Sequence, residues 1–275
     1  MALFDSARAK IERARKQTDA LQAVFEGFYK SKPYSIRQEL NPQAGEKRLV
    51  FHADPLPLEW SVIIGEIVHN LRSALDHSIY ELTCIETGHP LDGTEFPVFE
   101  DESKYFEVNK RGEPTRKSGL YKIRGIKDEG RRAVIKGLQP FEFRKTHPPD
   151  QLPIIALVHE LNIVDKHRTL HLCRMSTTQL QTRVLRDIHP ISMAVVIQRL
   201  EDGTEVARWK PVGNFNDEVD MESEVSFEIA FGDSVPILQG KGVIAICEHL
   251  IRGVERVLHY LSAPDEGGTS GFSPR

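Results

Sequence analysis

The chain has 275 residues, of which 40% are hydrophobic and 28% charged, with a formal net charge of −4 and a pI near 6.3. This composition is typical of a globular protein and gives no overall positive charge to attract nucleic acid or an anionic membrane. Cys84, Cys173 and Cys247 are too few and too far apart to predict a zinc knuckle or a disulfide framework. No apolar run reaches the length of a membrane span, and the first residues lack the pattern of a secretory signal. We therefore expect a cytoplasmic protein without a membrane partner.

The first third of the sequence predicts a helix, a hairpin and a second helix. Apolar residues recur at spacings of three and four over residues 4–29, and Pro33 ends this helix. Two strand-like runs, 34–40 and 47–52, flank a turn rich in Pro and Gly. The second helix is predicted over residues 60–82.

The middle of the chain mixes irregular and helical segments. Residues 86–126 are rich in charge, Gly and Pro, and they predict a long irregular excursion. A short helix is expected over residues 127–136. The next helix is expected to begin after Asp150, a natural N-cap, and to end near Val164.

The spacing of apolar residues changes to two between Thr169 and Phe231, which predicts β-strands. Residues 201–204 predict a hairpin turn between two of them. A strongly amphipathic helix follows over 243–261, and the Gly- and Ser-rich tail over 264–275 is predicted to be disordered. The expected strands cover residues 182–185, 191–200, 205–210 and 225–231.

These elements predict an α+β fold. About four main helices form a bundle, and an antiparallel β-sheet is inserted at about 169–231. Because no linker separates the helices from the strands, we expect residues 1–263 to form a single composite domain.

The run from Trp60 to Leu82 carries the most informative pattern. On a helix of 3.6 residues per turn, its apolar residues share one broad face and its polar residues share the other. Solvated helix faces are usually rich in Lys, Glu, Arg and Gln. This face instead holds hydrogen-bonding and proton-handling groups, which predicts contact with a partner or ligand. We call it the polar stripe, and its members are Glu66, His69, Asn70, Ser73, Asp76, His77 and Tyr80, with Arg72 at its margin.

Four residues separate Arg72 from His77 on this predicted helix. The spacing resembles the Arg-x4-His motif of the HEPN superfamily, helical-bundle proteins that are often metal-independent endoribonucleases. The resemblance implies a homodimer that joins two copies of the motif, RNA as a partner, no cofactor and a role as a toxin or defence effector. It implies that Arg72 stabilises charge on the scissile phosphate and that His77 is the general acid or base. The supporting residues would be His69, Asn70, Ser73, Asp76 and Tyr80.

A second dense cluster, Asp165-Lys166-His167-Arg168, lies at the end of the predicted helix that precedes the strands. Three potentially cationic side chains could bind phosphate there and supply a local basic site. The same residues could also complement the dipole of a helix C-terminus. The segments 71–77 and 165–168 together resemble a pattern in uncharacterised bacterial proteins, a resemblance that implies no chemistry.

Three readings of the polar stripe stay open. The first is the HEPN-like endoribonuclease or RNA-binding protein. The second is a non-catalytic interaction or dimerisation module, in which polar residues such as Arg72 and Asp76 pair at i,i+4 and fix the packing of the helices. The third is a helical-bundle metalloenzyme that uses His69, His77 and His159. The spacing does not favour this third reading, because His69 and His77 are eight residues apart.

Overall fold

The computed structural model places most of the chain in two compact units. We call residues 1–19, 62–168 and 245–275 the helical unit, and residues 20–61 and 169–244 the sheet unit. The prediction of a single composite domain over 1–263 stays a prediction, and the predicted tail over 264–275 lies outside the described residues. The structure describes residues 3–148, 151, 153–176, 181–184, 199–210, 221–224 and 226–262.

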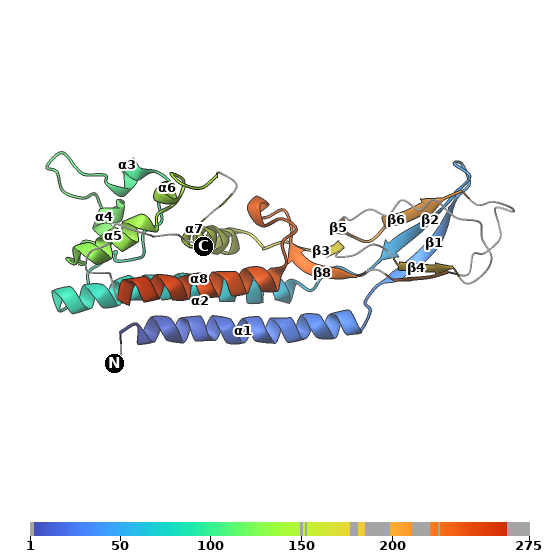
Figure 1. Ribbon diagram of the computed structural model, residues 1–275, viewed down its shortest axis with the longest axis horizontal. Helices are drawn as coiled ribbons and strands as arrows, with labels where there is room; N and C mark the ends of the chain where they lie inside the picture. Colours follow the sequence, from blue (N-terminus) through green and yellow to red (C-terminus); the bar gives the residue numbers. More distant parts are fainter. Residues whose placement is uncertain are drawn as a thin grey trace. The chain divides into compact units, whose positions relative to one another are not determined.

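The fold is α+β, as the sequence predicted, and Figure 1 gives the order of its elements. No helix in the described part of the chain is both long and apolar enough to cross a membrane. The described residues form the helices α1 (Asp5–Lys30), α2 (Leu58–Thr87), α3 (Glu102–Tyr105), α4 (Gly119–Lys122), α5 (Glu129–Gly137), α6 (Pro140–Phe143), α7 (Ile154–His167) and α8 (Val243–Ser262), and the 3-10 helix η1 (Pro236–Leu238).

All strand pairs in the described residues are antiparallel. Three strands lie in the order β1-β2-β6, three more in the order β5-β3-β8, and β4 pairs with β7. The strands are β1 (Ser35–Asn41), β2 (Glu46–His52), β3 (Leu172–Ser176), β4 (Gln181–Val184), β5 (Arg199–Leu200), β6 (Thr204–Trp209), β7 (Met221–Glu224) and β8 (Phe227–Phe231).

Four long helices contribute to the helical unit, as the sequence predicted. Just before α1, the Phe4 N–H donates a hydrogen bond to Glu81 Oε2 of α2 at 2.7 Å. The apolar face of α2 is buried, and a guanidinium of α1 pairs with a carboxylate of α8 in Arg15–Glu255 at 2.6 Å. A Cβ at Gly253 of α8 would lie 2.5 Å from a side-chain atom of Ile154 on α7, so this glycine lets the two helices approach closely.

The helices α2 and α7 meet where a glycine faces an aspartate. A Cβ at Gly65 would lie only 2.0 Å from Asp165 Oδ1, and such a contact does not occur between real atoms. Because Gly65 lacks a side chain, the carboxylate of Asp165 can lie against α2. The prediction that helix 150–164 ends before Asp165 is corrected here: α7 continues through His167. Asp150, its predicted N-cap, lies outside the described residues, and Pro153 occupies the N-cap position.

The sheet unit is built around aromatic side chains. Trp60 lies 4.9 Å from both Phe25 and Phe28, measured between ring centroids, and Tyr34 stacks on Phe51 at 5.4 Å. The Tyr29 hydroxyl accepts a hydrogen bond from the Ile229 amide at 2.9 Å, which fixes α1 against β8. Such aromatic pairs add specific geometry to a buried apolar core.

Two strand predictions are corrected by the observed pairing. The antiparallel pairing is not confined to the expected insert at about 169–231, because β2 of the early hairpin pairs with β6. Residues 201–204 do form a turn, with Gly203 at a φ of +80°, but it joins β5 and β6, which belong to different sheets in the described residues. Pattern along the sequence shows which face of a strand is apolar but not which strand will be its neighbour. Residues 185, 191–198 and 225 of the predicted strands lie outside the described residues.

Candidate functional site

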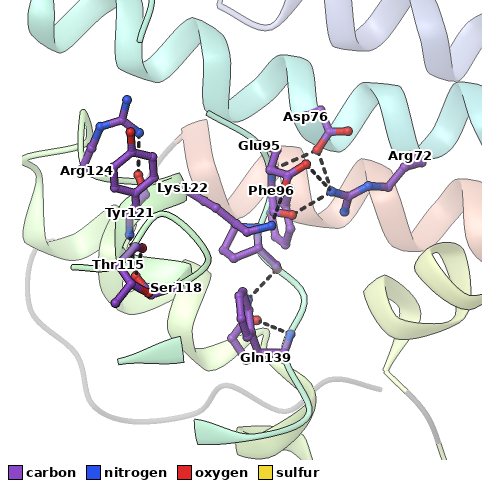
Figure 2. A network of polar contacts seen from close by, with 12 residues as sticks. Arg72, Asp76, Glu95, Phe96, Thr115, Ser118, Tyr121, Lys122, Arg124 and Gln139 are labelled. Carbon is purple, nitrogen blue, oxygen red and sulfur yellow. Dashed lines mark hydrogen bonds and ion pairs between the residues drawn. The ribbon is translucent and has the colours of Figure 1, made fainter. Parts of the chain in front are cut away.

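Arg72 is anchored to the peptide group of Phe96. Its side chain leaves the middle of α2 and is 9% exposed. Its Nη2 donates to the Phe96 carbonyl at 2.9 Å and lies 2.8 Å from Asp76 Oδ1. Asp76 Oδ1 in turn accepts the Phe96 N–H at 2.9 Å. Two side chains one helical turn apart therefore hold both polar groups of one buried residue, as Figure 2 shows.

Glu95 extends this arrangement to a second cation. One carboxylate oxygen lies 3.9 Å from Arg72 Nη2, and the other makes a close ion pair with Lys122 Nζ of α4. The Glu95 side chain is 43% exposed, so it lies at the border between the buried pair and solvent. Figure 2 shows Glu95 between the arginine and the lysine.

The residues that follow Phe96 are held by a third anchor. Gln139, just before α6, is fully buried. Its Nε2 donates to the Pro97 carbonyl at 2.9 Å, and its Oε1 accepts the Phe99 N–H at 3.1 Å. The segment 95–99 therefore has a fixed position despite lacking helical or strand structure, because three separate parts of the helical unit bind its backbone and side chains.

His159 of α7 is electrostatically linked to the same residues. Burial is the main cause that lowers the pKa of His159 to about 4, and the positive charges of Arg72 and Lys122 lower it further. The imidazole is therefore neutral near pH 7. We call Arg72, Asp76, Glu95, Lys122 and His159 the Arg72 cluster.

Two nitrogen atoms of the cluster are buried without a hydrogen-bond partner among the described residues. They are Arg72 Nη1 and His159 Nδ1. A buried polar atom of this kind costs about 1–3 kcal/mol relative to a satisfied one, and native proteins contain few of them. Burial also raises the pKa of Asp76, although the charge of Arg72 opposes that effect. The cluster is thus a desolvated site with unused hydrogen-bonding capacity.

The His77 ring forms its hydrogen bond with α1 and not with Arg72 or Phe96, although its charge lowers the pKa of Asp76. The His77 ring contacts Ser6 of α1, with Nδ1 2.6 Å from the hydroxyl oxygen. Asn70 also faces α1, where Nδ2 donates to Gln17 Oε1 at 3.0 Å and Oδ1 accepts from Lys10 Nζ at 3.3 Å. Within one chain, these members of the polar stripe contribute to helix packing.

The remaining stripe residues lie nearer to solvent. His69 is exposed, and its Nε2 lies 3.5 Å from the Ser73 hydroxyl. Tyr80 is 47% exposed, and a contact with Cys84 raises the pKa of its phenol. The polar stripe is therefore divided between packing against α1 and exposure to solvent.

The predicted phosphate-binding residues lie at the C-terminal end of α7, and Lys166, His167 and Arg168 are all exposed. The charge of Lys166 makes a small contribution to the lowered pKa of His159. Burial raises the pKa of Asp165, whereas His69 of α2 lowers it. The structure thus brings one end of the second sequence cluster beside the stripe.

Sequence reasoning missed Glu95, Lys122 and Gln139. All three lie outside the long periodic helices, and Glu95 and Lys122 fall in the segment expected to be irregular. The described residues contain no group of three or more His, Cys, Asp or Glu side chains that could hold a metal ion. Comparisons with protein-family models, curated proteins and solved structures find no match.

Proposed function

We propose that the chain is an HEPN-like RNA-binding protein whose Arg72 cluster receives a phosphate group of the RNA. The observation that carries this proposal is the pair of unsatisfied buried nitrogens, Arg72 Nη1 and His159 Nδ1. Phosphate oxygens are strong acceptors for a guanidinium, and they also accept from an imidazole whose Nδ1 bears the proton. A bound phosphate would therefore satisfy groups that the fold leaves unpaired.

The position of Glu95 supports the same proposal. Its carboxylate lies between Arg72 and Lys122, where an anion is attracted by two cations. Because the Glu95 side chain is 43% exposed, it can turn toward solvent without breaking the fold. We infer that Glu95 occupies the anion position when RNA is absent and leaves it when a phosphate arrives.

The contacts of the two motif residues favour binding over cleavage by a single chain. Arg72 binds Phe96 and Asp76, whereas His77 contacts Ser6. Cleavage within one chain would use His159, since this is the imidazole that senses the charge of Arg72. Cleavage with His77 would need a second copy of the chain to supply the missing group, as the HEPN resemblance implies.

The sharpest test compares two substitutions of opposite charge in the cluster. Lys122→Met removes a cation and should weaken binding of labelled single-stranded RNA about tenfold, or about 1.4 kcal/mol. Glu95→Gln removes the competing carboxylate and should strengthen binding severalfold. Fluorescence anisotropy with a mixed-sequence oligonucleotide at about 50 mM salt measures both, and affinity should fall steeply as salt rises.

Matched controls separate this site from the general effect of charge. Lys127→Met and Glu129→Gln change exposed residues outside the cluster and should alter RNA affinity little. The proposal fails if wild-type protein binds no RNA of a broad panel, or if the cluster variants behave like these controls. RNA that is cut in the presence of a chelator by wild type, but not by His159→Gln, would add cleavage to the function.

A second candidate function is a non-catalytic interaction module. The observation that favours it is the bracketing of the Phe96 peptide by Arg72 and Asp76, which gives both residues a structural task. Tyr80 and Ile85 of α2 are 47% and 63% exposed and would contribute to a contact with another chain. A dimer that sedimentation detects in wild type and that Tyr80→Ser/Ile85→Ser abolishes, without any RNA binding, would favour this function.

A further inference from the structure

The sheet unit contains a cavity of about 890 Å³ that is separate from the Arg72 cluster. All residues that line it belong to the sheet unit. Its wall combines apolar side chains with three arginines, and its volume lies within the range of small-molecule sites. Its lining includes Arg37, His52, Asp54, Arg174, Arg199 and Leu200.

Arg174 is a buried arginine in the wall of this cavity. It lies on β3, lines the cavity and is only 6% exposed. Its guanidinium carbon lies 5.8 Å from the ring centroid of Phe28 and 5.9 Å from that of Phe227. These rings hold the planar group by cation–π attraction, but they accept no conventional hydrogen bond.

The hydrogen-bonding capacity of Arg174 is largely unused. Nη2 donates to the backbone carbonyl of Asp54 at 2.5 Å, and Nε is buried with no partner in the described residues. Burial lowers the pKa of Arg174, whereas the nearby Asp54 carboxylate opposes that effect. A guanidinium stays protonated in proteins, so this buried charge is compensated only in part, by the Asp54 carboxylate.

Two other basic residues of the wall each have an acidic neighbour. Arg199 Nε lies 2.6 Å from Glu201 Oε1, and His52 Nδ1 lies 3.0 Å from Asp202 Oδ1. The exposed Arg37 of β1 adds a further positive charge to the lining. A ligand with one anionic group would therefore meet its best partner at Arg174.

We propose that this cavity binds a small organic anion, with Arg174 receiving its carboxylate or phosphate group and the apolar wall holding its organic body. The planar fork of arginine matches both kinds of group through paired hydrogen bonds. The phenyl rings on Arg174 pre-orient the fork, which lowers the entropy lost when the ligand binds. This site is independent of the function proposed for the helical unit.

Calorimetry on the full chain tests the proposal with ligands that share one body. The probes are 4-phenylbutyrate, 4-phenylbutyl phosphate and the uncharged 4-phenylbutan-1-ol. At least one anionic probe should bind tenfold or more tightly than the alcohol. Arg174→Met should remove this preference, and Arg37→Ala should reduce it severalfold. Because Arg37 is exposed, the second variant remains informative even if Arg174→Met does not fold.

Two control variants show which unit of the chain binds the probes. Arg15→Met, which changes an exposed arginine of the helical unit, should bind the probes as wild type does. Lys122→Met, which changes the Arg72 cluster, should also retain the binding if the cavity is the site, whereas a loss of binding in Lys122→Met would move the signal to the helical unit and overturn the proposal. Equal affinity for anion and alcohol, no binding of any probe, or a preference that survives both cavity variants would equally overturn it. Tighter binding of 4-phenylbutyl phosphate than of 4-phenylbutyrate identifies a phosphoester ligand, and the opposite order identifies a carboxylate.

Discussion

The two units each bury an arginine to a similar degree, 7% exposed for Arg72 and 6% for Arg174, but they surround it differently. Arg72 has a carboxylate at 2.8 Å and a second at 3.9 Å. Arg174 has two aromatic rings and one carbonyl oxygen. Arg72 stabilises a local structure through its paired Nη2 and keeps only Nη1 for a ligand, whereas Arg174 has no carboxylate at such short distance among the described residues and keeps more of its donors for one. Burial alone therefore does not show what an arginine does.

The largest expected effect on stability is that of Arg72→Met. The substitution removes the donor to the Phe96 carbonyl and leaves the partly buried Asp76 carboxylate without its cation. Breaking such a pair should lower the free energy of unfolding by about 3 kcal/mol. Urea unfolding measures the loss, and hydrogen exchange at the Phe96 amide should accelerate with it.

Asp76→Asn serves as the partner in a double-mutant cycle with Arg72→Met. If the two residues act as one unit, the double variant should be less destabilised than the sum of the single variants. Strict additivity would show that Arg72 stabilises the segment 95–99 without Asp76. Pairing with a carboxylate would then not explain why Arg72 and Arg174 differ.

A moderate effect is expected from pH through His159. The pKa of His159 falls from 6.5 in an unfolded chain to about 4 in the folded one, so the unfolded state binds more protons between these values. Its contribution to stability is therefore fully present above pH 6.5 and is lost as pH falls toward 4. His159→Gln should flatten this part of the stability profile, as measured by thermal unfolding across pH 4–8. Identical profiles for the variant and wild type would contradict the lowered pKa.

The smallest effect on stability is expected at Arg174. Removing a buried charge that has no close counter-charge relieves its desolvation cost, which offsets the lost hydrogen bond to the Asp54 carbonyl and the lost contacts with the two rings. Arg174→Met should therefore change the free energy of unfolding by no more than about 1 kcal/mol, which is the scale expected for the exposed pair at Arg15. Urea unfolding of Arg174→Met and Arg72→Met under the same conditions compares the two losses of stability directly. A loss at Arg174 as large as that at Arg72 would mean that Arg174 also holds the fold together.

The long helices could be predicted because their apolar spacing depends only on local sequence. Residues 4–29 predicted α1 within one residue at each end, and 243–261 predicted α8 equally well. The end of α7 was placed too early because the charged residues after Val164 resemble a helix boundary. Strand partners could not be predicted, since β2 pairs with β6 across more than 150 residues of sequence.

Only part of the candidate site could be predicted from the sequence. The helix that carries Arg72 and Asp76 was identified from its unusual polar face. Glu95 and Gln139 could not be found, because no periodicity marks a residue that binds another segment from an irregular loop. The direction of His77 could not be found either, since it depends on how α1 packs against α2.

The anchoring of Phe96 also determines where this chain can change in length. The end of α2 and the Phe96 peptide are fixed separately, and the connection between them contains Gly88 and Gly93, both at positive φ. His89 and Pro90 within it are exposed. Extra residues inserted between them should lengthen the loop at a small entropic cost, because that cost grows only slowly with loop length. A single residue inserted between Phe96 and Phe99 would instead displace either the Arg72 contact or the Gln139 contact. The 89–90 junction is therefore the natural place for an epitope or a fluorescent label that reports on the cluster without disturbing it.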